Sequence, residues 1–345
     1  MKIQKLIQSL LALCMAGLAA LTLGAGMATA QPDASGRVSL MTEIPASAQV
    51  VTVGLYVNTV YQLEVSSSTY YLDAYMWFKW KGDIDPTATM ELTNLVEEWG
   101  AMVTPLNEEP QILADGSSYT LMKVEGRFMQ PFQLGDYPLD HQKLSIYIED
   151  NTYGSDQLVY VLDEAESGYG HMLAIPGWQI DQWSWQSLAH DYGTFFGAEA
   201  AGSAAVYSTL RFDLEISRPV NFFVWKLMLP LVILLMASWM VLVIDPRLVE
   251  VRTALPATGL LTAVFLQQAY SDSLPEVGYL VLIDKIYAVA YAMIIATLLR
   301  AIWTARATNS TDAGEVAALR KTDRSLLIGQ VALFAAAIAV IVLAR

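Results

Sequence analysis

Seven residues between positions 250 and 272 recur at steps of three or four, which places them on one face of a helix. They are Glu250, Ala254, Thr258, Leu261, Phe265, Gln268 and Asp272. No charge interrupts the chain from Thr253 to Ser271, so such a helix could cross a bilayer core of roughly 30 Å. Polar groups aligned on one face inside a membrane need water or protein beside them. The stripe therefore indicates either the wall of an ion pathway or a bundled helix bonded to its neighbours.

The first 30 residues have the pattern of a secretory signal. Two lysines precede an apolar run from Leu10 to Leu23, and the small residues Ala28-Thr29-Ala30 follow it. We expect cleavage after Ala30. The chain's single cysteine, Cys14, lies in this segment, so the mature chain would have no disulfide and no cysteine-ligated metal.

Composition argues against several classes of function. The formal net charge of −14 disfavours nucleic-acid binding, which needs basic surface. None of the three histidines has the spacing of a metal site or a nucleophile turn beside it. The acidic run at Asp163, Glu164 and Glu166 is typical of a solvated loop. Weak Ca²⁺ binding is the alternative, although the pattern of a calcium loop is absent. We expect a protein that is not an enzyme and has no cofactor and no metal site.

The predicted β domain covers residues 31–217 and begins with a polar stretch at 31–45. From Gln49 to Glu215 short apolar runs alternate with turn signals, which is typical of an antiparallel β-sandwich. The clearest predicted strands are Val50–Val60, Tyr70–Trp80, Tyr119–Met129, Lys143–Ile148, Leu158–Leu162, Trp178–Leu188 and Tyr207–Ile216.

Residues 218–345 predict a four-helix transmembrane bundle. The expected spans are 222–244, 251–271, 279–303 and 325–344, with a cytoplasmic loop at 305–324. Basic residues gather in that loop and in the turn after the first span, whereas the turn after the second span has none. Because basic loops favour the cytoplasm, we expect a multi-pass protein of the inner or plasma membrane. Its β domain and C-terminus would both lie outside, in agreement with the secretory signal.

An exported β-sandwich joined to four spans, the second one striped, resembles the pentameric ligand-gated ion channels. Four motifs in the family's order carry the resemblance. Tyr137-Pro138-Leu139-Asp140 resembles the core of the signature loop, and Asn151-Thr152-Tyr153-Gly154 resembles a ligand-binding loop. Ser217-Arg218-Pro219 is similar to the entry into span one, and Ser273-Leu274-Pro275 to the outer end of the pore helix. Gln130 and Leu144 stand where animal members have cysteines, so the chain resembles the prokaryotic branch.

Two features depart from the family pattern. The family's Trp-x-Pro-Asp stretch appears only as Trp99-Gly-Ala-Met. Pro256 and Gly259 lie inside the expected pore helix, where a proline removes a backbone hydrogen bond and can kink the helix. A kink there would turn Glu250 away from the lumen.

The resemblance implies a homopentamer whose second spans enclose a lumen within the lipid bilayer. Carboxylate rings at Glu250 and Asp272 would favour monovalent cations, and Leu261 with Phe265 would form an apolar collar that closes by dewetting. The alternative for Glu250 is a salt bridge with Arg247 or Arg252.

The family architecture implies a small-molecule agonist site between subunits, lined by aromatic residues. The candidates are Tyr75, Asn151, Tyr153, Tyr192, Phe195, Phe196 and Tyr207. Aromatic faces attract organic cations by about 0.5–2 kcal/mol each. An amine or protons would both suit an acidic, aromatic-lined site. The alternative is that each aromatic belongs to the sandwich core, which for Tyr75 is equally well supported.

The resemblance also implies a coupling region between the two domains. Glu64, Asp140 and Arg218 would meet there, beside Pro138 and Pro275. A structural salt bridge is the simpler explanation of the same residues.

A different class of function remains open, namely a membrane-anchored sensor or adhesion protein whose spans only hold it. The striped second span distinguishes the two, since an anchor does not need Thr258, Gln268 and terminal carboxylates on one face. A transporter would need a second, similar set of spans, and the sequence contains none.

Overall fold

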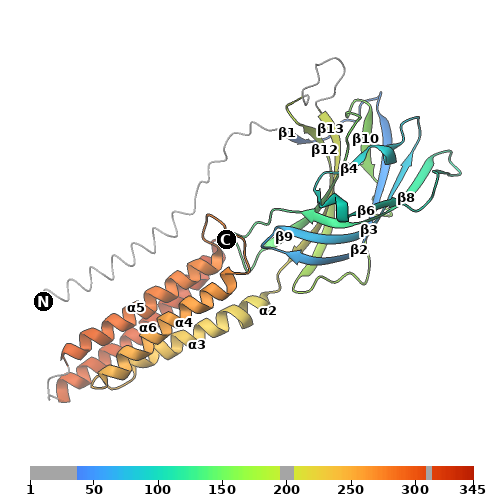
Figure 1. Cartoon of the computed structure of the whole chain (residues 1–345). Coiled ribbons are helices and arrows are strands. Elements are labelled where there is room, and N and C mark those ends of the chain that lie inside the picture. Colours follow the sequence, from blue (N-terminus) through green and yellow to red (C-terminus); the bar gives the residue numbers. More distant parts are fainter. Residues whose placement is uncertain (1–36, 195–205, 308–312) are drawn as a thin grey trace. The chain divides into compact units, whose positions relative to one another are not determined.

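The computed structural model describes residues 37–194, 206–307 and 313–345, which form two compact units (Figure 1). One unit contains the β-strands and ends at Arg218. The other contains the helices from Pro219 onward, together with the loop Leu134–Asp140. The predicted signal peptide, with Cys14, lies outside the described residues.

The β unit is a two-sheet sandwich. One sheet has the order β1-β12-β13-β9-β4, and the other has the order β10-β2-β3-β8-β5, with β11 beside β2 and with β6 and β7 beside β8. The strands are β1 (Arg37–Leu40), β2 (Gln49–Glu64), β3 (Thr69–Trp80), β4 (Met90–Leu92), β5 (Leu95–Val96), β6 (Met102–Pro105), β7 (Gln111–Ile112), β8 (Ser118–Met129), β9 (His141–Asp150), β10 (Leu158–Leu162), β11 (Gly168–Tyr169), β12 (Gln179–Asp191) and β13 (Val206–Ser217). Two short 3-10 helices, η1 (Pro86–Ala88) and η2 (Glu98–Gly100), lie between strands.

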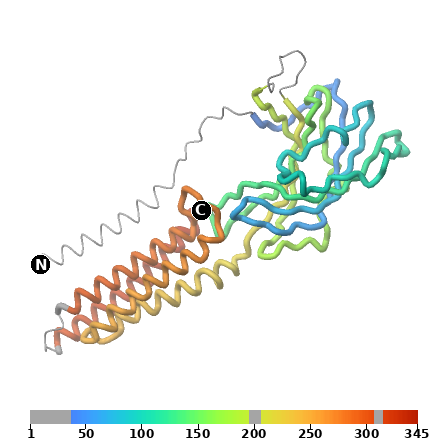
Figure 2. Tube along the Cα trace, viewed as in Figure 1, coloured from blue at the N-terminus to red at the C-terminus, as the bar shows by residue number. Residues whose placement is uncertain are grey.

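Alternate residues of the long strands fill the space between the sheets. Val51, Val53, Leu55 and Val57 of β2 are buried, as are Leu144, Ile146 and Ile148 of β9. This period of two is what a strand with one buried face requires. The tube in Figure 2 shows how green β9 runs beside yellow-green β13, far from it in sequence.

Most strand pairs are antiparallel, as expected, but β10 and β11 run parallel to β2. The chain leaves β9 in one sheet and continues as β10 in the other, so it reaches β2 without a hairpin.

The helical unit contains four helical stretches that are long and apolar enough to cross a membrane. The first is a continuous run of α2 (Val220–Phe222), the π-helical η3 (Phe223–Met228), α3 (Leu229–Trp239) and η4 (Met240–Leu242). The others are α4 (Val249–Ser271), α5 (Leu282–Ala307) and α6 (Ala313–Leu343), and the bundle packs α4 against α3 and α5, and α5 against α6 (Figure 1). Pro230 in the first turn of α3 lacks an N–H, which accounts for the wider π turn before it.

Most of the segment 305–324 is helical, although the sequence suggested a loop. Helix α5 extends to Ala307 and α6 begins at Ala313. The predicted cytoplasmic loop includes Asp323, which is only 1% exposed. Its partners, Arg252 and Arg300, lie on α4 and α5. This charged stretch of α6 is therefore packed against the other helices.

A buried ionic cluster joins all four helical stretches. Arg252 of α4 is 1% exposed, and its Nη2 donates to Asp323 Oδ2 of α6 at 2.6 Å. Its Nη1 donates to Thr304 Oγ1 of α5 at 3.1 Å, and its Nε to the carbonyl of Val241 in η4 at 3.0 Å. Arg300 Nε of α5 donates to the second carboxylate oxygen of Asp323 at 2.8 Å. Asp323 therefore balances two guanidinium groups.

Replacing Asp323 with alanine should lower the free energy of unfolding by about 3–5 kcal/mol, because the buried Arg252 and the partly buried Arg300 lose their counter-charge. Thermal unfolding of the purified protein in detergent measures the change. Asp245→Asn is the matched control, since its ion pair with Arg320 is exposed to solvent. Equal melting temperatures for the Asp323 variant and the parent would contradict the role given to this carboxylate.

Candidate functional site

The seven residues of the polar stripe are all exposed on one face of α4 or at its end. Leu261 is 57% exposed and Phe265 is 65% exposed, so lipid, water or another protein surface must face these large apolar side chains. Glu250 lies in the first turn and Asp272 caps the last one. The predicted stripe is therefore a surface that this chain does not cover.

The opposite face of α4 is buried against other parts of the same chain. Its buried residues are Arg252, Pro256, Ala263 and Tyr270, which at about 100° per residue lie across the helix from the stripe. Helix α4 is continuous through Pro256, whose ring lies on this buried face. A β-carbon at Gly259 would lie 2.5 Å from Ser238 Oγ, so glycine allows α4 to approach the first span closely.

The structure bears on the alternative explanation of Glu250. Arg252 is bound to Asp323, Thr304 and Val241, and within the part of the chain that the structure describes Glu250 forms no ion pair. Glu250 is exposed at the start of the stripe. The salt bridge proposed as an alternative is thus absent here, and Pro256 does not turn Glu250 out of the stripe.

A second group of functional side chains surrounds Glu149 near the end of β9. Glu149 is only 4% exposed. Its carboxylate accepts hydrogen bonds from Tyr192 Oη at 2.6 Å and Thr209 Oγ1 at 2.5 Å, and His190 Nδ1 lies 3.0 Å away. The Tyr192 ring packs against His190 at 4.0 Å and against Tyr207 at 5.7 Å between centroids. An acid and three aromatic rings thus share one site on the five-stranded sheet.

Glu91 adds a second carboxylate to this site. It lies directly opposite Glu149 where β4 pairs with β9. Partial burial and the neighbouring Glu149 raise the pKa of Glu91, and burial together with the hydrogen bond to Glu149 raises the pKa of Tyr192. Both shifts show a region in which extra negative charge is unfavourable, so a bound cation would relieve it.

The turn that carries Asn151 and Tyr153 is organised by a buried neighbour, Asp150. Its Oδ1 accepts from the backbone N–H groups of Thr152 at 2.9 Å and Tyr153 at 2.7 Å, and Oδ2 accepts from Thr89 Oγ1 at 2.7 Å. Asn151 is exposed and Tyr153 is half-buried. Asp150 therefore fixes the conformation of the predicted ligand loop, which follows Glu149 directly in the sequence.

The other predicted ligand residues do not join this group within one chain. Tyr75 lies on β3 in the eight-stranded sheet, and Lys123 Nζ sits 4.6 Å from its ring centroid. Phe195 and Phe196 lie outside the described residues. Sequence reasoning missed Glu91, Glu149, His190 and Thr209. The adjacent acids Glu149 and Asp150, at the end of an apolar strand, were the sequence signal that could have identified these two residues as part of the site.

The loop Leu134–Asp140 meets the outer ends of the helices. The N–H groups of Leu282 and Ile283, at the start of α5, donate to the carbonyls of Gly135 at 2.9 Å and Tyr137 at 3.2 Å. These first-turn donors have no partner within their own helix, so the loop satisfies them. The Tyr137 ring stacks on Tyr270 of α4 at 6.3 Å. The predicted signature loop thus touches both α4 and α5.

The base of this loop is closed by an amide pair on the β unit. Gln142 Nε2 donates to the carbonyl of Gln133 at 2.8 Å, and the N–H of Gln133 donates to Gln142 Oε1 at 3.0 Å. Arg218 stacks over Trp178 at 4.1 Å, and Glu64 accepts from Ser67 Oγ at 3.0 Å. The meeting of Glu64, Asp140 and Arg218 remains a prediction, as do the roles of Pro138 and Pro275.

Metal ligands do not gather in the described parts of the chain, where no group of three or more histidine, aspartate or glutamate side chains could hold an ion.

Comparison with known proteins gives relatives of low identity, and no family model matches the chain. A gamma-aminobutyric acid receptor subunit beta of Lymnaea stagnalis is 26% identical over 212 residues, 59% of this chain and 41% of the relative. The human gamma-aminobutyric acid receptor subunit rho-3 is 27% identical over 173 residues, 49% of this chain and 35% of the relative. A glutamate-gated chloride channel of Drosophila melanogaster is 23% identical over 189 residues, 55% of this chain and 40% of the relative.

The matched region spans less than half the length of each of these relatives. They are subunits of Cys-loop ligand-gated channels, and a β-sandwich followed by four membrane-length helices matches the fold of that group. The same arrangement fits a multi-pass membrane protein with an extracellular N-terminal domain. The chain is thus similar in sequence to subunits of these channels at low identity, and its β-sandwich followed by four membrane-length helices matches their two-domain fold.

Proposed function

We propose that this chain is the subunit of a homopentameric ligand-gated ion channel. A small cationic molecule binds at the Glu149 site of the β domain and opens a cation pore lined by the stripe of α4. The exposed stripe, set opposite a face fixed by buried contacts, is the observation that carries the proposal.

The chemistry of the stripe supports a gated pore. Leu261 and Phe265 lie one helical turn apart, so rings of both would form an apolar constriction that excludes water when narrow. Glu250 and Asp272 mark the two ends of the stripe. An anchor helix gains nothing from exposing these groups together, which disfavours the alternative of a membrane-anchored sensor.

Ion selectivity is the point on which the stripe and one relative differ. The Drosophila relative is named a chloride channel. In this chain Glu250 is exposed at one end of the stripe, while Arg252 is buried and neutralised by Asp323. The exposed charges along the stripe are therefore carboxylates, and these favour cations.

The Glu149 site supports a ligand that carries an ammonium group. Gamma-aminobutyric acid and glutamate, which name the relatives, both contain one. Glu91 and Glu149 supply negative charge, and the faces of Tyr192 and Tyr207 attract organic cations. Tyr75, on the other sheet, would contribute from a neighbouring subunit.

Coupling would pass through the loop Leu134–Asp140. Its contacts with Tyr270 and the start of α5 place it against the helix that carries the stripe and the helix beside it. A displacement of the loop would break specific hydrogen bonds and a ring contact, which are discrete changes of the kind a switch requires.

Glu250→Ala and Leu261→Ser should fail in different ways. Removing five carboxylates should reduce single-channel conductance or cation preference, whereas a serine ring should wet the closed pore and give resting current or higher agonist sensitivity. Currents in planar bilayers and reversal potentials in asymmetric salt measure the two effects.

Matched controls separate the stripe from general damage. Leu260→Ser makes the same change one residue off the stripe, and Glu315→Ala removes an exposed carboxylate at the start of α6. Two inert stripe variants would overturn the pore assignment. A parent channel whose reversal potential follows chloride would overturn cation selectivity alone.

Glu149→Gln should raise the half-maximal concentration of an amine agonist by about 10- to 100-fold, because a charge-assisted hydrogen bond contributes about 1.5–3 kcal/mol. Tyr207→Ala should shift the response in the same direction. Dose–response curves for primary amines, with surface expression measured in parallel, test both variants.

Glu215→Gln is the control for this site, because Glu215 lies on the same sheet and is bound to Lys143. An unchanged response of the Glu149 and Tyr207 variants would place the agonist elsewhere. Opening by acid in the absence of any amine would identify protons as the agonist.

The purified protein should form a pentamer, since one stripe per chain cannot enclose a lumen alone. Native mass spectrometry in detergent gives the number of subunits directly. A monomer or dimer in mild detergent would contradict the channel proposal and favour an anchored sensor.

A further inference from the structure

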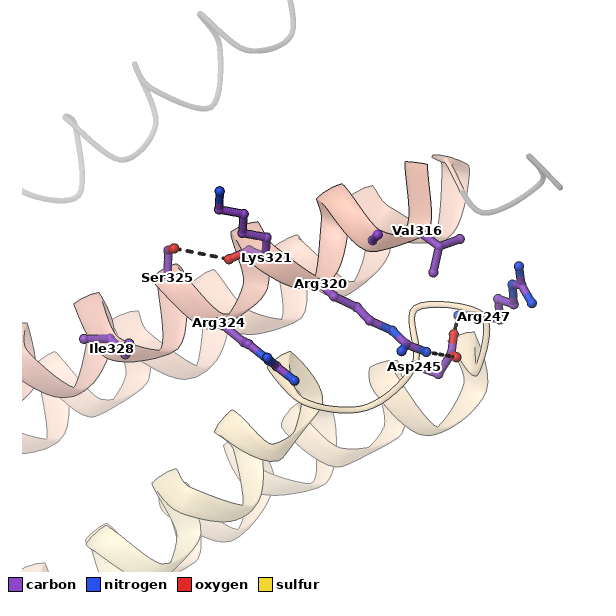
Figure 3. Close-up of a pocket in the computed structure, with 9 residues that line it drawn as sticks. Asp245, Arg247, Val316, Arg320, Lys321, Arg324, Ser325 and Ile328 are labelled. Atoms are coloured by element: carbon purple, nitrogen blue, oxygen red, sulfur yellow. Dashed lines mark hydrogen bonds and ion pairs between the residues drawn. The ribbon is translucent and has the colours of Figure 1, made fainter. Parts of the chain in front are cut away.

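A groove outside the stripe and the Glu149 site lies between the turn that precedes α4 and the first half of α6 (Figure 3). Its volume is about 540 Å³. Four basic residues and one acid line it, namely Arg247, Arg320, Lys321, Arg324 and Asp245, and we call it the basic groove. None of these residues belongs to α4 or to its stripe.

The positive charge of the basic groove is only partly neutralised. Arg320 is paired with Asp245. Among the residues that the structure describes, the side chains of Arg247, Lys321 and Arg324 form no ion pair or hydrogen bond. Figure 3 shows Arg320 and Arg324 extending from α6 towards the segment that carries Asp245. Lys321 and Arg247 point away from this pair in Figure 3. Two guanidinium groups beside one carboxylate leave an excess of positive charge, which suits an anion with several oxygen atoms.

Apolar side chains continue the groove along α6. Val316 lies at one end and Ile328 at the other, one helical turn beyond Arg324 on the same side. Ile328 is 70% exposed, and the helix beyond it is an apolar, membrane-length segment with little burial. A ligand that fills this groove would therefore have a charged end at the arginines and an apolar end along α6.

We propose that the basic groove binds an anionic phospholipid, with its phosphate held by Arg320 and Arg324 and an acyl chain lying along Ile328. Guanidinium groups bind phosphate oxygens in a bidentate manner, and basic residues at a membrane surface attract anionic lipids. A free anion would use the arginines but has no need of the apolar continuation. The proposal concerns a lipid site and does not depend on the channel function.

Asp245 gives the proposal a sharp consequence, because it competes with a lipid phosphate for Arg320. The backbone N–H of Arg247, and the side chain of Arg320, lower the pKa of Asp245, so this carboxylate is charged at neutral pH. Neutralising it removes both the competitor and a repulsive charge. A change at Asp245 should therefore strengthen lipid binding, whereas changes at the arginines weaken it.

The test is native mass spectrometry of the purified full chain in neutral detergent, titrated with dioctanoyl phosphatidylglycerol. The parent should bind this lipid more tightly than dioctanoyl phosphatidylcholine. The double variant Arg320→Gln with Arg324→Gln should bind phosphatidylglycerol about 10- to 30-fold more weakly, and Asp245→Asn should bind it more tightly.

Lys226→Gln is the matched control, since it removes an exposed positive charge at the other end of the first span. An equal loss of binding in this variant would show general attraction to any cation and would overturn the site. Equal affinity for phosphatidylcholine, or weaker binding by Asp245→Asn, would do the same. Displacement of the lipid by inorganic phosphate at similar concentrations would identify a free-anion site instead.

Discussion

Arg252 is the residue on which the arrangement of the helices depends. Its guanidinium is buried and reaches the first span at Val241, α5 at Thr304 and α6 at Asp323, so one side chain of α4 contacts the other three helical stretches. A buried cation is tolerated only when it is paired and fully hydrogen-bonded, so α4 can adopt few rotations about its own axis. In the rotation that satisfies Arg252, the stripe residues face away from the bundle.

The outer half of α4 is held by a second polar network on the same side. Asp284 of α5 accepts hydrogen bonds from Tyr270 at 2.5 Å and Gln267 at 3.1 Å, and Tyr291 donates to Gln267. Tyr137 of the loop Leu134–Asp140 stacks on Tyr270. The two networks lie at opposite ends of α4, so the polar groups of its inner face are satisfied within the chain. On the stripe, Gln268 donates to Asp272 at 2.6 Å, whereas within the described residues the Glu250 carboxylate has no ion pair, so in a membrane Glu250 requires a partner subunit or water.

The sequence predicts what depends on local period and misses what depends on register. The stripe, the long strands and the four spans follow from spacings of two or of three to four residues, which the chain shows directly. The Glu149 site requires β4, β9, β12 and β13 to align so that Glu91, Tyr192 and Thr209 converge, and single-sequence patterns do not set that alignment. The sequence gives no sign that Asp323, inside the predicted cytoplasmic loop 305–324, is buried, because its partners Arg252 and Arg300 lie far away in sequence.

Helix α6 brings the buried cluster and the basic groove together. Asp323 and Arg324 are neighbours in sequence, yet one is bound inside the bundle and the other faces the groove, because successive residues differ by about 100° around a helix. Asp245 stands in the turn just before α4, where its carbonyl accepts the N–H of Leu248. A phosphate that draws Arg320 from Asp245 would therefore change the electrostatics at the entry of the striped helix. If lipid binding shifts the equilibrium of α4 towards one conformation, that conformation must bind the lipid more tightly by the same factor, since coupling free energies are reciprocal.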